Sequence, residues 1–115
     1  MDKLILKYNA TRVDDIEKAK GLPIENCIAD NTINNLALMI MKGLQNEDGT
    51  VGVTRPKAIE IIDEYLSEKD KDELLFDITE ALVDGGFLLR ELDIAKLREK
   101  KAKYLTQANE QIDNI

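Results

Sequence analysis

The sequence contains no histidine and no tryptophan, and it has a single cysteine. Without histidine, the chain lacks the commonest general base and metal ligand, and it can form no Ser-His or Cys-His pair. Cys27 therefore has no histidine to activate it, and a small buried apolar side chain is the better interpretation. One cysteine allows no disulfide within the chain, which is typical of a reducing compartment. These absences predict a protein that is not an enzyme and that needs no cofactor.

Basic residues are also in deficit, with 16 Lys and Arg against 23 Asp and Glu and a net charge of −7. Nucleic-acid binding depends on neutralisation of phosphates by Lys and Arg, and anionic membranes attract the same side chains. The sequence also lacks a signal-peptide pattern and any apolar run near the roughly 20 residues that span a bilayer. We expect a cytoplasmic protein with neither a nucleic acid nor a membrane as partner.

Aromatic residues make up only 4% of the chain, while hydrophobic residues make up 43%. The core must therefore be aliphatic, which suits helices better than an aromatic-rich sheet. The length is that of one ordinary domain, residues 1–115. The predicted fold class is mainly α: a compact bundle of four to five helices with a short N-terminal β-strand or small β-ribbon.

The N-terminal residues 3–8 alternate in polarity and predict the strand, with Leu4, Leu6 and Tyr8 on one side and Ile5 on the other. A lone strand cannot satisfy its own backbone, so it needs a partner. Within the chain the best candidate is Thr50–Val53, after an Asp-Gly turn signal. The alternative is pairing with a second copy. The strand residues Leu4, Ile5, Leu6 and Tyr8 are therefore candidates for self-association into a homo-oligomer.

Turn and cap signals divide the rest of the chain into helices. The first runs from a cap at Asn9 or Thr11 to about Lys20 and ends at Gly21, and Pro23 opens a short helical turn through Ile28. Asp30 or Asn31, Thr54 and Asp70 are the predicted caps of the next three helices. Their apolar stripes are Ile33, Leu36, Ala37, Ile40, Met41 and Leu44; Ala58, Ile61, Ile62, Tyr65 and Leu66; and Leu74, Leu75, Ile78, Ala81 and Leu82.

A last helix is predicted from about Leu92, with Ile94 and Leu97 docking it on the core. Lys101 breaks its apolar stripe, so we expect the outer half to bind a partner or to pack weakly. The candidate partner-binding residues are Tyr104, Leu105, Ala108 and Ile112, which have the spacing of groove-binding helices. The basic positions Lys96, Arg98, Lys100, Lys101 and Lys103 form either a solvated face or a docking strip for an acidic segment.

Three acidic groups are candidate metal ligands. The clusters Asp14, Asp15, Glu17 and Asp70, Asp72, Glu73 are expected at or near helix N-terminal turns, where acidic residues favour the macrodipole. Residues 46–50, Asn-Glu-Asp-Gly-Thr, lack the ligand spacing and closing Glu of a calcium loop. The sequence therefore predicts no metal site.

Several segments, taken in order, resemble the tail assembly chaperones of long, non-contractile-tailed bacteriophages. These segments are Lys3-Leu4-Ile5-Leu6-Lys7-Tyr8-Asn9, Val13-Asp14-Asp15-Ile16-Glu17, Gly21-Leu22-Pro23-Ile24, Leu36 to Leu44, Ala58-Ile59-Glu60-Ile61-Ile62-Asp63 and Ile78-Thr79-Glu80-Ala81-Leu82. The resemblance covers residues 3–88 and rests on order and spacing, because no single segment is specific. From Glu91 onward the chain carries no signature of the family.

The resemblance implies a function that composition does not supply. Such chaperones coat the tape measure protein and recruit tail tube subunits in the cytoplasm of the bacterial host, and they are absent from the mature virion. The expected partners are accordingly the tape measure protein and the major tail tube protein. The alternative is another small acidic helical adaptor or regulatory protein, of which a DNA mimic is one version.

Overall fold

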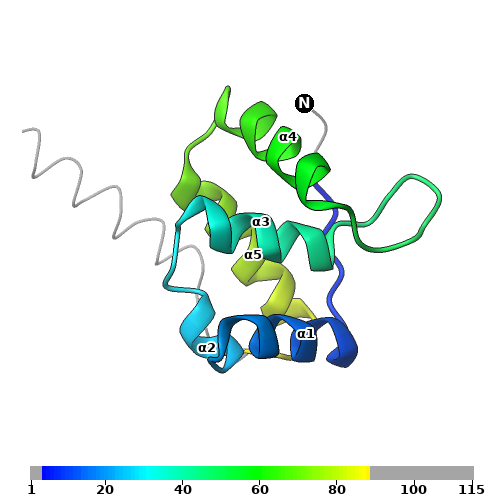
Figure 1. The fold of residues 1–115 in the computed structure, drawn as a ribbon, viewed down its shortest axis with the longest axis vertical. Helices are drawn as coiled ribbons and strands as arrows, with labels where there is room; N and C mark the ends of the chain where they lie inside the picture. Colours follow the sequence, from blue (N-terminus) through cyan, green and yellow to red (C-terminus); the bar gives the residue numbers. More distant parts are fainter. Residues whose placement is uncertain (1–3, 89–115) are drawn as a thin grey trace, which may run out of the picture.

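The computed structural model describes residues 4–88, and in this range it contains five helices. They are α1 (Ala10–Lys20), α2 (Ile24–Cys27), α3 (Ile33–Gly43), α4 (Arg55–Leu66) and α5 (Lys71–Asp84). α3 lies at the centre, with α4 and α1 on opposite sides of it and α5 behind (Figure 1). The predicted mainly helical fold class is confirmed. Within residues 4–88 no helix is long and apolar enough to cross a bilayer.

Local capping chemistry sets most of the helix boundaries. The Asn9 side chain accepts from the Arg12 N–H at the start of α1, and Gly21 ends the helix in the left-handed region at φ 68°. Thr54 and Asp70 cap α4 and α5 as predicted. The α3 cap is a correction, because Thr32 caps this helix in place of Asp30 or Asn31.

The core is built from the faces that the helices turn toward α3. Leu36, Ala37 and Ile40 of α3 are completely buried, as the periodicity predicts. Ile33 is a correction, because it lies in the first turn of the helix and is 38% exposed. Met39, outside the predicted stripe, is completely buried, since α3 has neighbours on more than one side. Leu74, Ile78 and Leu82 form the fully buried face of α5.

Among residues 4–88 the predicted β-structure is reduced to two isolated antiparallel bridges, Leu6 with Leu44 and Gln45 with Val51. The pairing of the N-terminal segment with Thr50–Val53 is therefore wrong. Residues 43–45 lie between the two and take the place of that partner: Lys7 N–H donates to the Gly43 carbonyl, and Gln45 N–H donates to the Ile5 carbonyl.

Tyr8 fixes the end of this extended segment to α3. Its ring is buried, and its hydroxyl donates a hydrogen bond of 2.9 Å to the Met39 carbonyl. A Cβ at Gly43 would collide with the Tyr8 ring, so glycine allows this ring to pack directly against the α3 backbone. Burial raises the pKa of the Tyr8 hydroxyl.

Candidate interaction surface

A groove runs between the extended residues 4–8 and helix α5, and we call it the N-terminal groove. Its volume is about 360 Å³. Its lining residues are Leu4, Ile5, Leu6, Lys7 and Tyr8 on one side and Asp77, Glu80, Ala81, Asp84 and Gly85 on the other. The groove therefore combines apolar side chains with a wall that carries several carboxylates.

One backbone edge of the N-terminal segment borders this groove. Ile5 and Lys7 direct their backbone groups to residues 43–45. Alternate residues of an extended chain face opposite edges, so the N–H and carbonyl of Leu6 face away from residues 43–45. Leu6 forms no backbone hydrogen bond to any residue between 4 and 88. An unpaired edge of this kind is a site where another chain can add main-chain hydrogen bonds.

The charged side chains of the groove are mostly acidic. Glu80 and Asp84 are exposed on α5 and form no ion pair with another described residue. Asp77 accepts a 2.7 Å hydrogen bond from the Tyr65 hydroxyl. Lys7 is the basic residue among the lining side chains. The groove thus favours a partner that is basic and partly apolar.

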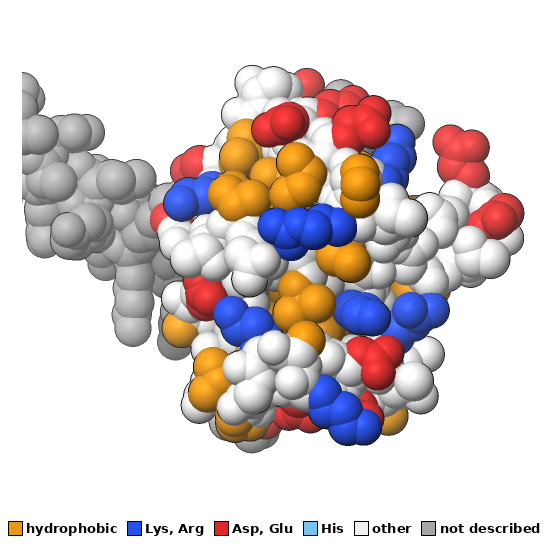
Figure 2. Space-filling model, in the orientation of Figure 1, with side chains coloured by type: hydrophobic (Ala, Val, Ile, Leu, Met, Phe, Trp, Pro, Cys, Tyr) orange, Lys and Arg blue, Asp and Glu red, His pale blue; other side chains and the backbone are white. Residues whose placement is uncertain are grey.

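A second surface lies over α3 and α4. Figure 2 shows hydrophobic side chains gathered in the middle of this face, with Lys and Arg side chains between them. The partly exposed apolar residues of these two helices are Ile33, Leu38, Met41, Ile59 and Leu66. Exposed apolar residues that are scattered singly need no functional explanation, and the charged residues divide this patch.

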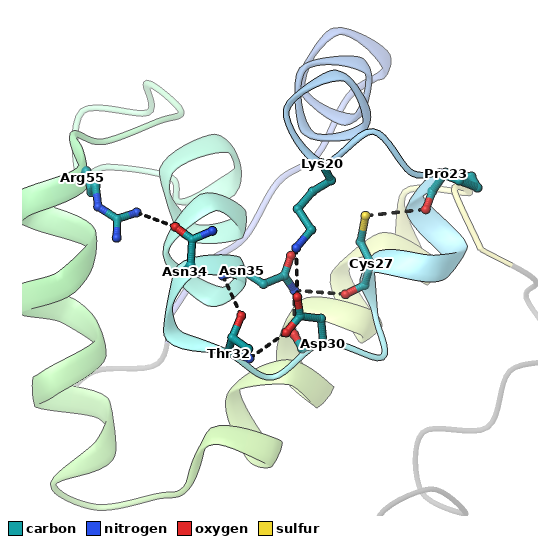
Figure 3. A network of polar contacts seen from close by, with 8 residues as sticks. All are labelled: Lys20, Pro23, Cys27, Asp30, Thr32, Asn34, Asn35 and Arg55. Atoms are coloured by element: carbon teal, nitrogen blue, oxygen red, sulfur yellow. Dashed lines mark hydrogen bonds and ion pairs between the residues drawn. The ribbon is translucent and has the colours of Figure 1, made fainter.

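The most connected polar group joins α1, α2 and α3, and we call it the α1–α3 junction: Lys20, Cys27, Asp30, Thr32 and Asn35 (Figure 3). The Lys20 ammonium lies 2.9 Å from the Asp30 carboxylate. Asn35, completely buried, donates from its amide to the carbonyls of Cys27 and Asp30 at 3.0 and 2.6 Å. The Asp30 carboxylate also accepts from the Thr32 N–H. These bonds satisfy backbone groups of the α2–α3 turn, so the junction is structural.

Asp30 acquires its low pKa from the same contacts. The Lys20 ammonium, followed by the Thr32 donors, lowers the pKa of Asp30 from 3.8 to about 2. These contacts also explain the shifted α3 cap. The Asp30 carboxylate is already engaged by Lys20 and by the Thr32 N–H, so the Thr32 hydroxyl caps the helix by accepting from Asn35 N–H.

The single cysteine belongs to the core. Cys27 is completely buried, and its thiol contacts the Pro23 carbonyl at 3.5 Å. Burial raises the pKa of this thiol, which lowers the fraction of reactive thiolate. The prediction of a small buried side chain is confirmed.

The three acidic residues of the α1 cluster each make a different structural contact. Asp14 pairs with Lys18 at 2.8 Å, Asp15 lies 3.9 Å from Lys42, and Glu17 accepts from the Ile24 N–H that opens α2. The cluster lies near the N-terminal turn of α1, as predicted, although the first turn itself has no acidic residue. In α5 the prediction is confirmed for Asp72 and Glu73.

The loop residues 46–50 form a closed turn. Asp48 accepts from the N–H and the hydroxyl of Thr50 at 3.0 and 2.6 Å, and Asn46 N–H donates to the Thr50 carbonyl. The two Thr50 hydrogen bonds, led by that of the hydroxyl, lower the pKa of Asp48. Among residues 4–88 no group of three or more Cys, Asp or Glu side chains is placed to hold a metal ion.

The predicted self-association residues fall into different environments. Ile5 is 54% exposed, whereas Leu4 and Leu6 are half-buried against the core. Tyr8 lies in the chain's own core, so its side chain is not available to a second copy. The predicted partner-binding residues Tyr104, Leu105, Ala108 and Ile112 lie outside the described residues, as does the helix predicted from about Leu92.

Sequence reasoning missed the acidic wall of the groove. Glu80 and Asp84 are four residues apart and share one face of α5. Their spacing was visible in the sequence, but an acidic helix face opposite an apolar stripe is also the normal solvated pattern. Only the packing of residues 4–8 beside this face makes it one wall of a groove.

Comparison with known proteins identifies no relative of this chain. No protein-family model, no curated protein and no solved structure matches the chain.

Proposed function

We propose that this chain is a tail assembly chaperone of a long, non-contractile-tailed bacteriophage, which binds the tape measure protein and recruits major tail tube subunits. The observation that carries the proposal is the order of segments in residues 3–88 that resemble this family. The segments between residues 13 and 82 lie in consecutive elements of the fold, from α1 through the turn into α2 and then α3, α4 and α5. The proposed place of action is the cytoplasm of the bacterial host, with no copy retained in the virion.

The surface of the molecule is compatible with a binding role. The N-terminal groove offers an unpaired backbone edge beside apolar side chains. Self-association through residues 4–8 would align several copies along one tape measure protein. In that arrangement Ile5 and the free edge of Leu6 would make the contact, while Tyr8 would hold the segment to α3.

Co-expression with the tape measure protein and the tail tube protein of the same genome tests the proposal. We expect the chain to co-purify with the tape measure protein and to keep it soluble. Deletion of residues 104–115 should sharply reduce co-purification while leaving the melting temperature nearly unchanged, because Lys101 interrupts the apolar stripe of the predicted helix before these residues. A large loss of stability would place the deleted segment in the core, and unchanged co-purification would exclude it as the partner site.

Self-association has a separate test. Light scattering over a concentration series should show oligomers that Ile5→Lys removes, while Leu22→Lys, at another exposed apolar position, should not remove them. A strict monomer at high concentration would contradict assembly through this segment.

The alternative is an acidic adaptor, such as a DNA mimic. It is favoured by the charge of the described residues, where nine Lys and Arg stand against seventeen Asp and Glu. Gene position separates the two functions. A tail chaperone is expected between the genes for the tail tube and tape measure proteins, and an unrelated position would favour the adaptor.

A further inference from the structure

Charge is divided very unequally along this chain. Residues 4–88 carry a net charge of −8, whereas the eight residues 96–103 carry five Lys and Arg and one Glu. Both regions belong to one chain, so each is the nearest candidate for neutralising the other.

Of the acidic surface of residues 4–88, the wall of the N-terminal groove is the part closest to the basic segment along the sequence. Gly85 lines the groove, and Leu88 lies three residues further along, at the end of the described chain. Lys96 follows eight residues after Leu88, a span of about 12 Å if helical and at most about 27 Å if extended. A tether this short gives an effective concentration in the millimolar range, so weak contacts are enough for docking.

We propose that the basic segment 96–103 docks in cis in the N-terminal groove, with its Lys and Arg side chains against the carboxylates of Glu80 and Asp84. Leu97, within the segment, supplies an apolar side chain for the apolar lining of Leu4, Leu6 and Ala81. The docked segment covers the free backbone edge of Leu6. Docking in cis therefore competes with any use of this edge by a second copy. This inference does not depend on the proposed function.

The groove and α4 provide a matched pair of acidic sites. Glu80 and Asp84 are exposed and line the groove. Asp63 and Glu64 are exposed on α4, away from the groove, and offer the same two side chains. The double variants Glu80→Lys with Asp84→Lys and Asp63→Lys with Glu64→Lys thus change the net charge equally. A difference in docking between the two double variants therefore depends on the position of the carboxylates and not on the overall charge.

Paramagnetic relaxation enhancement measures the contact directly. A nitroxide is attached at Ala102→Cys in the full chain with Cys27→Ala, which removes the buried native thiol. We expect broadening of the backbone amide signals of residues 4–8 and 77–85 but not of residues 55–66. The broadening should be unchanged on tenfold dilution and should disappear near 1 M salt, where the Debye length is about 3 Å.

The variants decide the assignment. The groove double variant should lose the broadening, the α4 double variant should keep it, and adding Lys100→Glu with Lys101→Glu to the groove variant should restore it. Equal broadening of residues 55–66 and the groove would overturn the proposal, as would a signal that falls with dilution, which would indicate contact between copies. Loss of broadening in both double variants would mean that the contact depends only on net charge. This result would also overturn the proposal. Unchanged chemical-shift dispersion in the variants verifies that each one is folded.

Discussion

At the α1–α3 junction the Lys20 ammonium and the Asp30 carboxylate face one another at 2.9 Å, and the buried amide of Asn35 donates to two carbonyls of the same turn. Across the N-terminal groove, in contrast, Glu80 and Asp84 pair with no described residue, and Leu6 leaves one backbone edge unpaired. The junction connects residues 20–35, which are close in sequence, whereas the groove joins residues 4–8 to residues 77–85. The junction is held by paired polar groups, although the buried Asn35 Oδ1 has no hydrogen-bond partner among the described residues. Unpaired polar groups at a surface groove are, in contrast, available to a partner.

Helix α5 has a buried face and an exposed face. A substitution on its buried face has the largest expected effect on stability. Ile78 is completely buried, so Ile78→Ala should lower the free energy of unfolding by about 2–5 kcal/mol, the usual range for emptying a core position. Glu80→Ala, two residues away on the exposed face, should change it by less than about 0.5 kcal/mol. Chemical denaturation of both variants is the measurement. Equal effects would mean that the two faces do not differ as described.

Removal of the buried amide should produce the next largest effect. Asn35→Ala leaves the carbonyls of Cys27 and Asp30 without their donor in a buried site, and we expect a loss of about 1–3 kcal/mol. Asn34→Ala is the control, because its hydrogen bond to Arg55 is exposed, and its effect should stay below about 0.5 kcal/mol. If Asn35→Ala cost no more than this control, the junction would not contribute to stability.

The sequence predicted the elements whose determinants are local. Asn9, Gly21, Thr54 and Asp70 set helix boundaries through side-chain or backbone bonds within a few residues. The last three were predicted, and Asn9 was one of two predicted caps for α1. The α3 cap was assigned wrongly because the engagement of Asp30 by Lys20 is a tertiary contact.

Long-range pairing was the harder part of the prediction. The N-terminal segment pairs with residues 43–45, which follow α3 directly and carry no strand pattern of their own. The groove depends on this pairing, so its location could not be predicted from local sequence patterns. The residues that it did single out for partner binding, 104–112, lie outside the described part of the chain.

The Lys20–Asp30 pair should make the stability of the junction depend on pH. The pKa of Asp30 is lowered to about 2 in the folded protein, so its contribution is complete above the unfolded pKa of about 4 and is lost as the pH falls toward 2. Asp30→Asn should cost about 1 kcal/mol at neutral pH, and this difference from the wild type should narrow between about pH 4 and pH 2. Unfolding curves at several pH values measure it.

An exposed ion pair on α1 supplies the control for that measurement. Asp14 pairs with Lys18 at 2.8 Å, but the two side chains are 55% and 76% exposed. Asp14→Asn should therefore change the stability at neutral pH by no more than a few tenths of a kcal/mol, as is usual for exposed pairs. A larger effect from Asp14→Asn than from Asp30→Asn would contradict the description of the junction as the site where charge contributes to the fold.

The smallest expected effect lies in the groove, and its sign is opposite. Asp84 is the last residue of α5, whose last turn contains no basic residue, so its carboxylate faces the negative end of the helix dipole. Asp84→Asn should raise the free energy of unfolding by about 0.3–1 kcal/mol at low salt.

If the basic segment 96–103 docks against Asp84, part of this gain is masked in the wild-type background, because the substitution also removes a favourable contact. The gain should then be larger when Lys100, Lys101 and Lys103 are replaced by Gln, and a double-mutant cycle isolates that difference. Destabilisation by Asp84→Asn in both backgrounds would show that this carboxylate supports the fold, as Asp30 does, and would remove the distinction between the two regions.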